Sequence, residues 1–268
     1  MILLDNKRYD ESELLAKMQN DDFYYNEMSV SKVLSYSSAK WLLKSPKYFV
    51  WKQKQQMVET QPLRDGKLIH MQILEPEKYN KLSFVDVSSK NTKIWKEAVV
   101  ENGKDNTYTV KERNVNNRIV QSFLRNDICM SYLKGNEFEV PGLIEMNKVP
   151  FRGKADILGD DFVADVKTTG DGVQEIDLRG GGTKNQFEFT VEKYDYDIQA
   201  YLYTQMFNKP RFVWLVIDKV TTEIGVFEAS QELLERGKAK LDDIISKYRV
   251  IFLEELIDLD QYLITKTI

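Results

Sequence analysis

The sequence has very little cysteine and histidine, and this limits the sites that it can build. Cys129 and His70 are the only residues of their kinds among 268. A single cysteine excludes disulfides within the chain and any zinc or iron–sulfur site that needs several cysteines. The lack of disulfides favours a cytoplasmic protein.

Long apolar runs and an excess of positive charge are also missing. No apolar run approaches the roughly 18 residues that span a bilayer. Met1–Leu4 is followed directly by Asp5, so we expect neither a signal peptide nor contact with a membrane. The formal net charge is −4, so any nucleic-acid surface has to be local.

The length and composition allow a large buried core, since 42% of the residues are hydrophobic. We expect a single domain over residues 1–268. A mainly helical part, residues 1–135, would precede a sheet core over residues 136–230, and residues 231–268 would form a C-terminal helix and tail.

Three predicted strands between Glu145 and Thr169 carry carboxylates and a lysine. Asp165 lies among apolar neighbours, and a buried strand rarely carries a charge unless that charge is paired or binds a metal. If Asp160-Asp161 form the hairpin loop, Asp156 faces Asp165 with Cβ atoms about 4.5–5.5 Å apart. A turn centred on Gly159-Asp160 would instead make them diagonal neighbours, about 7–8 Å apart.

The cluster extends beyond the two aspartates. Lys167 is two residues after Asp165 and projects from the same face, and Glu145 on the preceding strand would close the group. The alternative is a surface hairpin whose aspartates are balanced by Lys154 and Lys167. The whole cluster favours a divalent cation between the carboxylates.

A segment near the start combines lysines with aromatic residues. From Met28 to Val58 there are six lysines and no acidic residue, a pattern that suits phosphate contacts and base stacking. An ordinary core with a solvated lysine face explains the pattern equally well. The candidate DNA contacts are Lys40, Lys44 and Lys47, together with Arg64.

Two further segments bear on the site. A helix is predicted from near Gly66 to just before Pro76, where His70 is either a structural hydrogen-bonding residue or a metal ligand. A helix over Tyr194–Phe207 puts Gln199 and Tyr203 on one face. Between them, residues 170–192 read as a mobile glycine-rich loop, a candidate substrate-ordered flap.

In this order, the motifs resemble the PD-(D/E)XK nuclease superfamily, and within it the phage exonuclease VIII-type recombination nucleases. The residues that carry the resemblance are Gly66-x-x-x-His70, Glu145, Gly153-Lys154-Ala155-Asp156, Asp165-Val166-Lys167-Thr168-Thr169 and Gln199-x-x-x-Tyr203.

The resemblance implies an α/β, restriction-endonuclease-like core, with a central mixed β-sheet flanked by helices and a helical N-terminal part. It implies Mg²⁺ or Mn²⁺ as cofactor. The implied roles are metal binding by His70, Asp156, Asp165 and the Val166 carbonyl, with a contribution from Glu145, orientation or deprotonation of water by Lys167, and support of the site by Gln199 and Tyr203.

The expected function is metal-dependent exonuclease action on linear double-stranded DNA, 5′ to 3′, in phage-type recombination. The resemblance also implies a bacterial or phage-encoded protein, a homo-oligomeric ring and a single-strand annealing recombinase as partner. The alternatives are a related endonuclease or helicase-associated nuclease, and a catalytically inactive DNA-binding module on the same fold.

Overall fold

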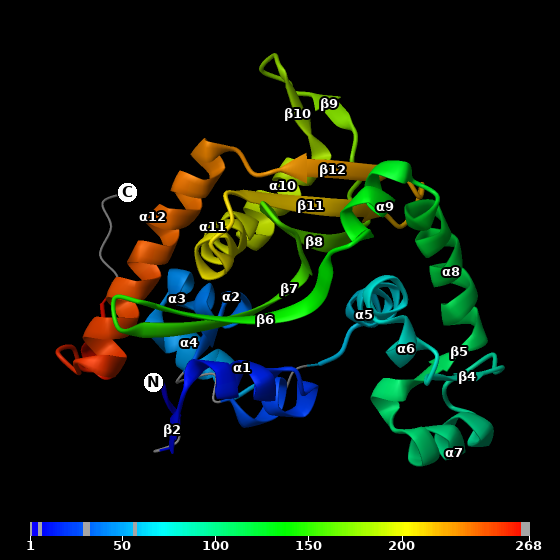
Figure 1. Cartoon of the computed structure of the whole chain (residues 1–268), viewed down its shortest axis with the longest axis horizontal. Helices are drawn as coiled ribbons and strands as arrows, with labels where there is room; N and C mark the ends of the chain where they lie inside the picture. The colour runs from blue at the N-terminus through cyan, green and yellow to red at the C-terminus, as the bar shows by residue number, and fades with distance from the viewer. Residues whose placement is uncertain (1, 5–6, 29–32, 56–57, 264–268) are drawn as a thin grey trace.

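A six-stranded mixed β-sheet forms the centre of the molecule (Figure 1). The computed structural model describes residues 2–4, 7–28, 33–55 and 58–263. The strands of this sheet are β3 (Leu34–Ser35), β6 (Glu137–Met146), β7 (Val149–Leu158), β8 (Phe162–Thr169), β11 (Arg211–Asp218) and β12 (Ile224–Glu228).

The strand order is β12-β11-β8-β7, and β7 pairs with both β6 and β3. The β8–β11 and β3–β7 pairs are parallel, and the other three are antiparallel. The β7–β8 ladder pairs Ile157 with Ala164 and Leu158 with Val163. This is the register predicted from a hairpin loop at Asp160-Asp161, and that prediction is confirmed.

Helices cover both faces of the sheet. This fits β11, whose side chains are apolar on both sides and have to be buried. Phe212, Trp214 and Val216 belong to one buried cluster, and Val213, Leu215 and Ile217 belong to the other. Such a continuous apolar run is typical of a strand buried on both faces. The expected α/β class with a central mixed sheet is therefore confirmed.

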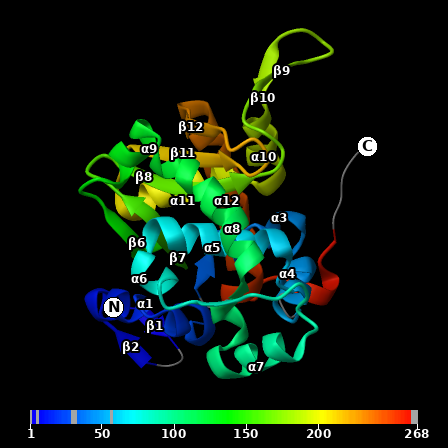
Figure 2. The same cartoon turned by 90° about the vertical axis from the view of Figure 1, so that its right-hand side faces the viewer.

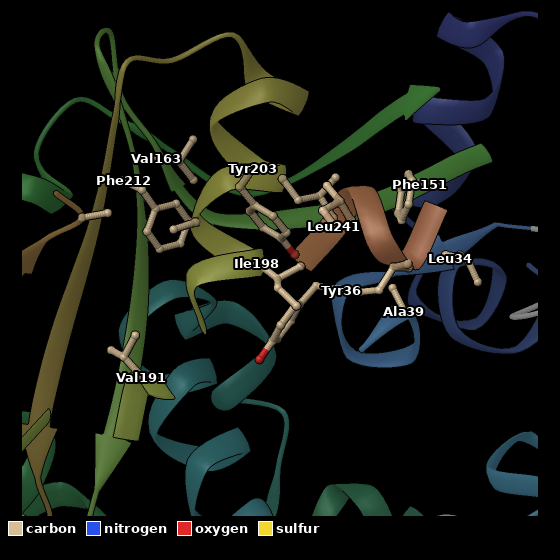
Figure 3. Packing of buried hydrophobic residues seen from close by; sticks show 14 of the residues in the cluster. Leu34, Tyr36, Ala39, Phe151, Val163, Val191, Ile198, Tyr203, Phe212 and Leu241 are labelled. Atoms are coloured by element: carbon tan, nitrogen blue, oxygen red, sulfur yellow. The ribbon is translucent and has the colours of Figure 1, made fainter. Parts of the chain in front are cut away.

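The first face packs against helices from both ends of the chain. In this cluster Phe151, Val163 and Phe212 of the strands lie close to Ile198 and Leu241 of the helices (Figure 3). The helices are α2 (Tyr36–Ala39), α3 (Trp41–Lys44), α4 (Pro46–Gln53), α10 (Gln186–Tyr194), α11 (Tyr196–Phe207) and α12 (Gln231–Tyr248).

The second face packs against α5 (Gln61–Leu74), α8 (Val110–Leu124) and α9 (Asp127–Leu133). The α5 helix starts earlier than the sequence suggested, because Pro62 is accommodated in its first turn. Beyond this layer lie α6 (Pro76–Tyr79), β4 (Ser83–Val85), α7 (Lys93–Asn102), the 3₁₀ turn Lys104–Asn106 and β5 (Thr107–Thr109).

A third, small cluster packs against β6, in which Leu14 and Met18 of α1 (Glu11–Met18) and Phe23 of the π-helical turn η1 (Phe23–Glu27) lie with Leu143. Two short paired strands, β1 (Ile2–Leu4) and β2 (Lys7–Tyr9), precede α1. After α12 come the turns Arg249–Leu253 and Leu259–Gln261. No helix in the described part of the chain is both long and apolar enough to cross a membrane.

The prediction of an irregular loop over residues 170–192 is wrong. The segment forms a projecting hairpin of β9 (Glu175–Asp177) and β10 (Thr183–Asn185), seen at the top of Figure 1, and then enters α10. Gly181 and Gly182 have positive φ at the hairpin tip, a conformation that glycine adopts without cost. A capping box between Asn185 and Glu188 starts the helix.

Candidate active site

Three side chains from three different elements converge beside the sheet. His70 of α5 places Nε2 2.6 Å from Asp156 Oδ2 on β7, and its Nδ1 lies 3.3 Å from Glu139 Oε1 on β6. One ligand atom from each of the three residues lies within 4.8 Å of the others. A nitrogen and two carboxylate oxygens at this spacing make a suitable partial ligand set for a divalent ion.

Asp156 occupies the point where β7 and β8 separate. Their ladder ends at Ile157 and Ala164, and Asp156 Oδ2 accepts a hydrogen bond of 2.8 Å from the Val166 amide. The carboxylate thus replaces the next ladder partner. Burial disfavours its charge, but His70, Lys167 and the Val166 amide together outweigh burial and lower the pKa of Asp156.

Asp165 presents its carboxylate to α11 and to a lysine on its own strand. Its Oδ1 accepts from Gln199 Nε2 at 2.6 Å, and its Oδ2 lies 2.5 Å from Lys167 Nζ. Asp165 is 4% exposed. Burial, reinforced by the charge of Asp156, raises the pKa of Asp165 to about 6, although Lys167 opposes the shift.

The electrostatics of the cluster favour an added cation. Burial and the nearby Asp156 charge raise the pKa of Glu139 to about 7. Burial disfavours the imidazolium of His70, but Asp156 outweighs burial and raises its pKa to about 9. Glu139 Oε1 is buried and has no hydrogen-bond partner. Because an unsatisfied carboxylate oxygen faces a second carboxylate and an imidazole, the donor set fits Mg²⁺ or Mn²⁺.

These side chains line one cleft of about 950 Å³. Lys167 Nζ lies 4.9 Å from the centre of the Tyr196 ring, which stacks on Tyr194 with centroids 5.7 Å apart. Lysines from other elements also line the cleft. The cleft therefore combines carboxylates with cations and aromatic faces.

Glu145 is not part of this cluster. It pairs with Pro150 near the turn end of the β6–β7 hairpin and is exposed. The prediction that Glu145 completes the cluster is therefore wrong. Glu139, which the sequence reasoning missed, occupies that place. The outward position follows from the register, because residue 145 lies next to the turn and residue 139 faces Asp156.

Tyr203 and Val166 are the two remaining predicted site residues. Tyr203 accepts a hydrogen bond from the Lys154 amide at 3.3 Å and packs against Gly153, so it supports β7. Val166 lines the cleft, and metal binding by its carbonyl stays a prediction.

Three of the four candidate DNA contacts lie at or near the surface. Lys40 is half-buried and donates to the Tyr194 carbonyl at 3.3 Å, close to the cleft lining. Lys44 is exposed, with its ammonium 4.5 Å from the centre of the Tyr48 ring. Lys47 is exposed and donates to the Asp260 carbonyl at 3.0 Å. For these three lysines, DNA contact stays a prediction.

Arg64 is the exception among the candidate DNA contacts, because its guanidinium is already engaged inside the protein. It is 4% exposed, donates to Glu112 at 2.9 Å and to the Thr107 carbonyl, and lies 3.9 Å from the centre of the Tyr108 ring. Its expected role in DNA contact is therefore corrected to a structural one.

Comparison with known proteins agrees with this arrangement. The family model described as "PDDEXK-like domain of unknown function (DUF3799)" matches residues 35–255. A structure of a "Putative exonuclease" from Eubacterium rectale is similar over 93% of this chain and 95% of its own, with 14% identity and a TM-score of 0.65.

A "phage related exonuclease" from Haemophilus somnus 129PT is also similar, over 63% of this chain and 91% of its own. Its sequence identity is 13% and its TM-score 0.33. No curated protein matches the sequence.

Proposed function

Because the chain belongs to the family of PDDEXK-like domains, we propose that it is a divalent-metal-dependent nuclease that hydrolyses phosphodiester bonds of DNA. The observation that carries the proposal is the convergence of Asp156, Asp165 and Lys167 with His70 and Glu139 in one cleft. Strands β7 and β8 supply the first three residues, and α5 and β6 supply the other two.

The residues that would hold the ion are His70, Glu139 and Asp156, with Asp165 and the Val166 carbonyl beside them. When bound, a divalent ion neutralises charge on the phosphate and lowers the pKa of a coordinated water. An imidazole ligand shifts preference toward Mn²⁺ over Mg²⁺. We therefore expect activity with Mn²⁺ at least equal to that with Mg²⁺.

The protein's own groups would orient the reacting atoms. Lys167 Nζ is held between Asp165 Oδ2 and the Tyr196 ring, and from there it would donate to the attacking water or to a phosphate oxygen. Gln199 fixes the other oxygen of Asp165. Because these side chains are already fixed in position, they can stabilise the transition state without reorganising during the reaction.

The finer proposal is exonuclease action on linear double-stranded DNA, 5′ to 3′. The name of the Eubacterium rectale protein, which shares the fold, supports the exonuclease part of this proposal, and the duplex substrate and the polarity rest on the sequence resemblance. A homo-oligomeric ring around the DNA would make such digestion processive, and a single-strand annealing recombinase would take up the 3′ strand that remains. Light scattering tests the ring, since a monomer at working concentration argues against it.

The decisive experiment compares linear duplex DNA, labelled at either end, with covalently closed circular duplex, in Mg²⁺ and in Mn²⁺. Release of the 5′ label first, with the circle intact, supports the proposal. Cutting of the circle favours the related endonuclease. Absence of metal-dependent cleavage by the wild type, matched by an Asp165→Ala variant, favours an inactive DNA-binding module.

A further inference from the structure

One carboxylate outside the catalytic cluster holds two lysines of the cleft. Asp21 Oδ1 accepts from Lys154 Nζ at 2.7 Å, and Asp21 Oδ2 accepts from Lys78 Nζ at 2.5 Å. All three residues line the same cleft as the catalytic side chains. Each oxygen of this carboxylate therefore has its own lysine, contributed by a different element.

Both lysines lie on or next to elements that carry catalytic side chains. Lys154 lies two residues before Asp156 on β7, and its Nζ is 3.9 Å from Glu139 Oε2. Lys78 lies on α6, which directly follows the helix of His70. The two ammonium groups thus flank the catalytic carboxylates at a position suited to a neighbouring phosphate of a bound strand.

Asp21 reaches the lysines from the N-terminal elements, which lie next to α6 in Figure 2. Its side chain is 46% exposed, whereas the Lys154 side chain is 7% exposed. A buried ammonium needs a nearby anion, since an unpaired buried charge is costly. The exposed Asp21 carboxylate is the nearer anion for Lys154, at 2.7 Å against 3.9 Å for Glu139, and it shares Lys78 with Glu75, which lies 2.5 Å from the same ammonium.

We propose that Lys78 and Lys154 form a phosphate-binding pair for the nucleic-acid backbone, and that Asp21 occupies the phosphate position until a strand enters. A phosphodiester, like a carboxylate, presents two anionic oxygens, and lysine binds phosphate as a point charge. Asp21 would then compete with the substrate. The inference rests on the proposed function and adds to it a named substrate contact.

The competition predicts that removal of the Asp21 charge strengthens binding. Fluorescence anisotropy with a labelled DNA oligonucleotide in EDTA measures affinity without hydrolysis. We expect Asp21→Asn to bind about five- to tenfold more tightly than the wild type, the change that corresponds to the loss of two partly exposed competing ion pairs. The dependence of affinity on salt becomes steeper, since the two lysines no longer pair with Asp21 and neutralise more of the phosphate charge.

Asp22→Asn is the matched control. It makes the same change in net charge one residue away, and Asp22 accepts from Asn26. A second variant, Asp21→Asn with Lys78→Gln, tests the pair itself and should return the affinity to the wild-type value or below. Because the Lys78 side chain is 45% exposed, the fold is expected to persist, and the thermal midpoint checks this.

The inference is overturned by unchanged affinity in Asp21→Asn, by an equal gain in Asp22→Asn, or by a gain that survives Lys78→Gln. Inorganic phosphate serves as competitor, and a gain for free phosphate without a gain for the oligonucleotide also overturns it. Failure of the nuclease proposal is seen separately, as absence of metal-dependent cleavage. The binding measurements in EDTA are independent of that outcome.

Discussion

Glu139 stands opposite Asp156 across the β6–β7 hairpin, between the pairs Phe138–Ile157 and Val140–Ala155. Its φ of 52° is unusual for a glutamate, and the surrounding ladder holds it there. The two carboxylates both reach His70. Like charges facing each other are destabilising unless a cation lies beside them. The His70 imidazolium is such a cation, since its pKa is raised to about 9, and a divalent ion would take the place of its proton.

Glu139→Gln is therefore expected to weaken Mn²⁺ binding and to lower nuclease activity, each by about 10- to 100-fold. Isothermal titration with Mn²⁺ and a cleavage assay measure the two effects. Glu145→Gln is the control, because Glu145 is an exposed residue of the same hairpin. Equal losses in both variants would show that the hairpin, and not the Glu139 carboxylate, is responsible.

The β6–β7 pairing could have been predicted from the sequence. A two-residue turn at Asn147-Lys148 puts residue 139 opposite residue 156, and both turn residues have positive φ in the structure. Asparagine favours such a turn, whereas lysine at the second position weakens the signal. The same reasoning succeeded for β7–β8, where Asp160-Asp161 mark the loop clearly.

Other features depend on contacts between distant segments. Arg64 is buried because Glu112, 48 residues away, and Thr107 converge on it. No local sequence pattern predicts these contacts. The helix α10 was missed for a different reason. Its capping box, Asn185 to Glu188, is a recognisable helix start, but the preceding glycines favoured the interpretation as a loop.

Lys167 is the residue whose loss should affect chemistry without affecting metal binding. Lys167→Gln removes the ammonium beside Asp165, and we expect kcat to fall by roughly 100- to 10,000-fold, the range for a positioned proton-transfer group. Mn²⁺ affinity should stay within a few-fold of the wild type.

Lys209→Gln is the control for Lys167→Gln. Lys209 is a half-buried lysine that donates to the Asp160 carbonyl at the β7–β8 loop, away from the cleft. Single-turnover cleavage separates the rate of chemistry from product release. A Lys167→Gln enzyme with wild-type kcat would contradict the assigned role.

Because Arg64 has a structural role, its substitution should lower the stability of the fold and leave DNA contact unchanged. Arg64→Met leaves Glu112 and Glu59 without this cation, and breaking a buried ion pair costs about 3–5 kcal/mol. Urea unfolding measures this loss. The slope of DNA affinity against salt concentration should stay as in the wild type.

If the lysine-rich surface contacts DNA, Lys44→Gln should change DNA binding and leave stability nearly unchanged. Lys44 is exposed, so stability should change by no more than about 0.5 kcal/mol, and the salt slope should fall by about 1. A salt slope that changes in Arg64→Met and not in Lys44→Gln would reverse both assignments.

Glu112 makes the stability of the α5–α8 region depend on acid pH. Burial disfavours its charge, but hydrogen bonds from Lys90, the Thr109 amide and Gln61 outweigh burial and lower its pKa from 4.5 to about 2. A depressed carboxyl pKa stabilises the folded state above pH 4.5, and that stabilisation is lost as the pH falls from 4.5 to 2. Glu112→Gln should therefore cost about 1.5–3 kcal/mol at neutral pH, as for a lost charged hydrogen bond.

The difference between wild type and Glu112→Gln is the quantity to follow, by urea unfolding at several pH values. It should shrink steadily below pH 4.5, because protonation removes from the wild type the same charge that the substitution removes. Glu97→Gln is the control: Glu97 is 65% exposed and pairs only loosely with Lys93, at 3.6 Å, so its effect should stay within about 0.5 kcal/mol. A Glu112→Gln deficit that is constant with pH would mean that shape and packing, and not the charge of this carboxylate, hold α8 against α5.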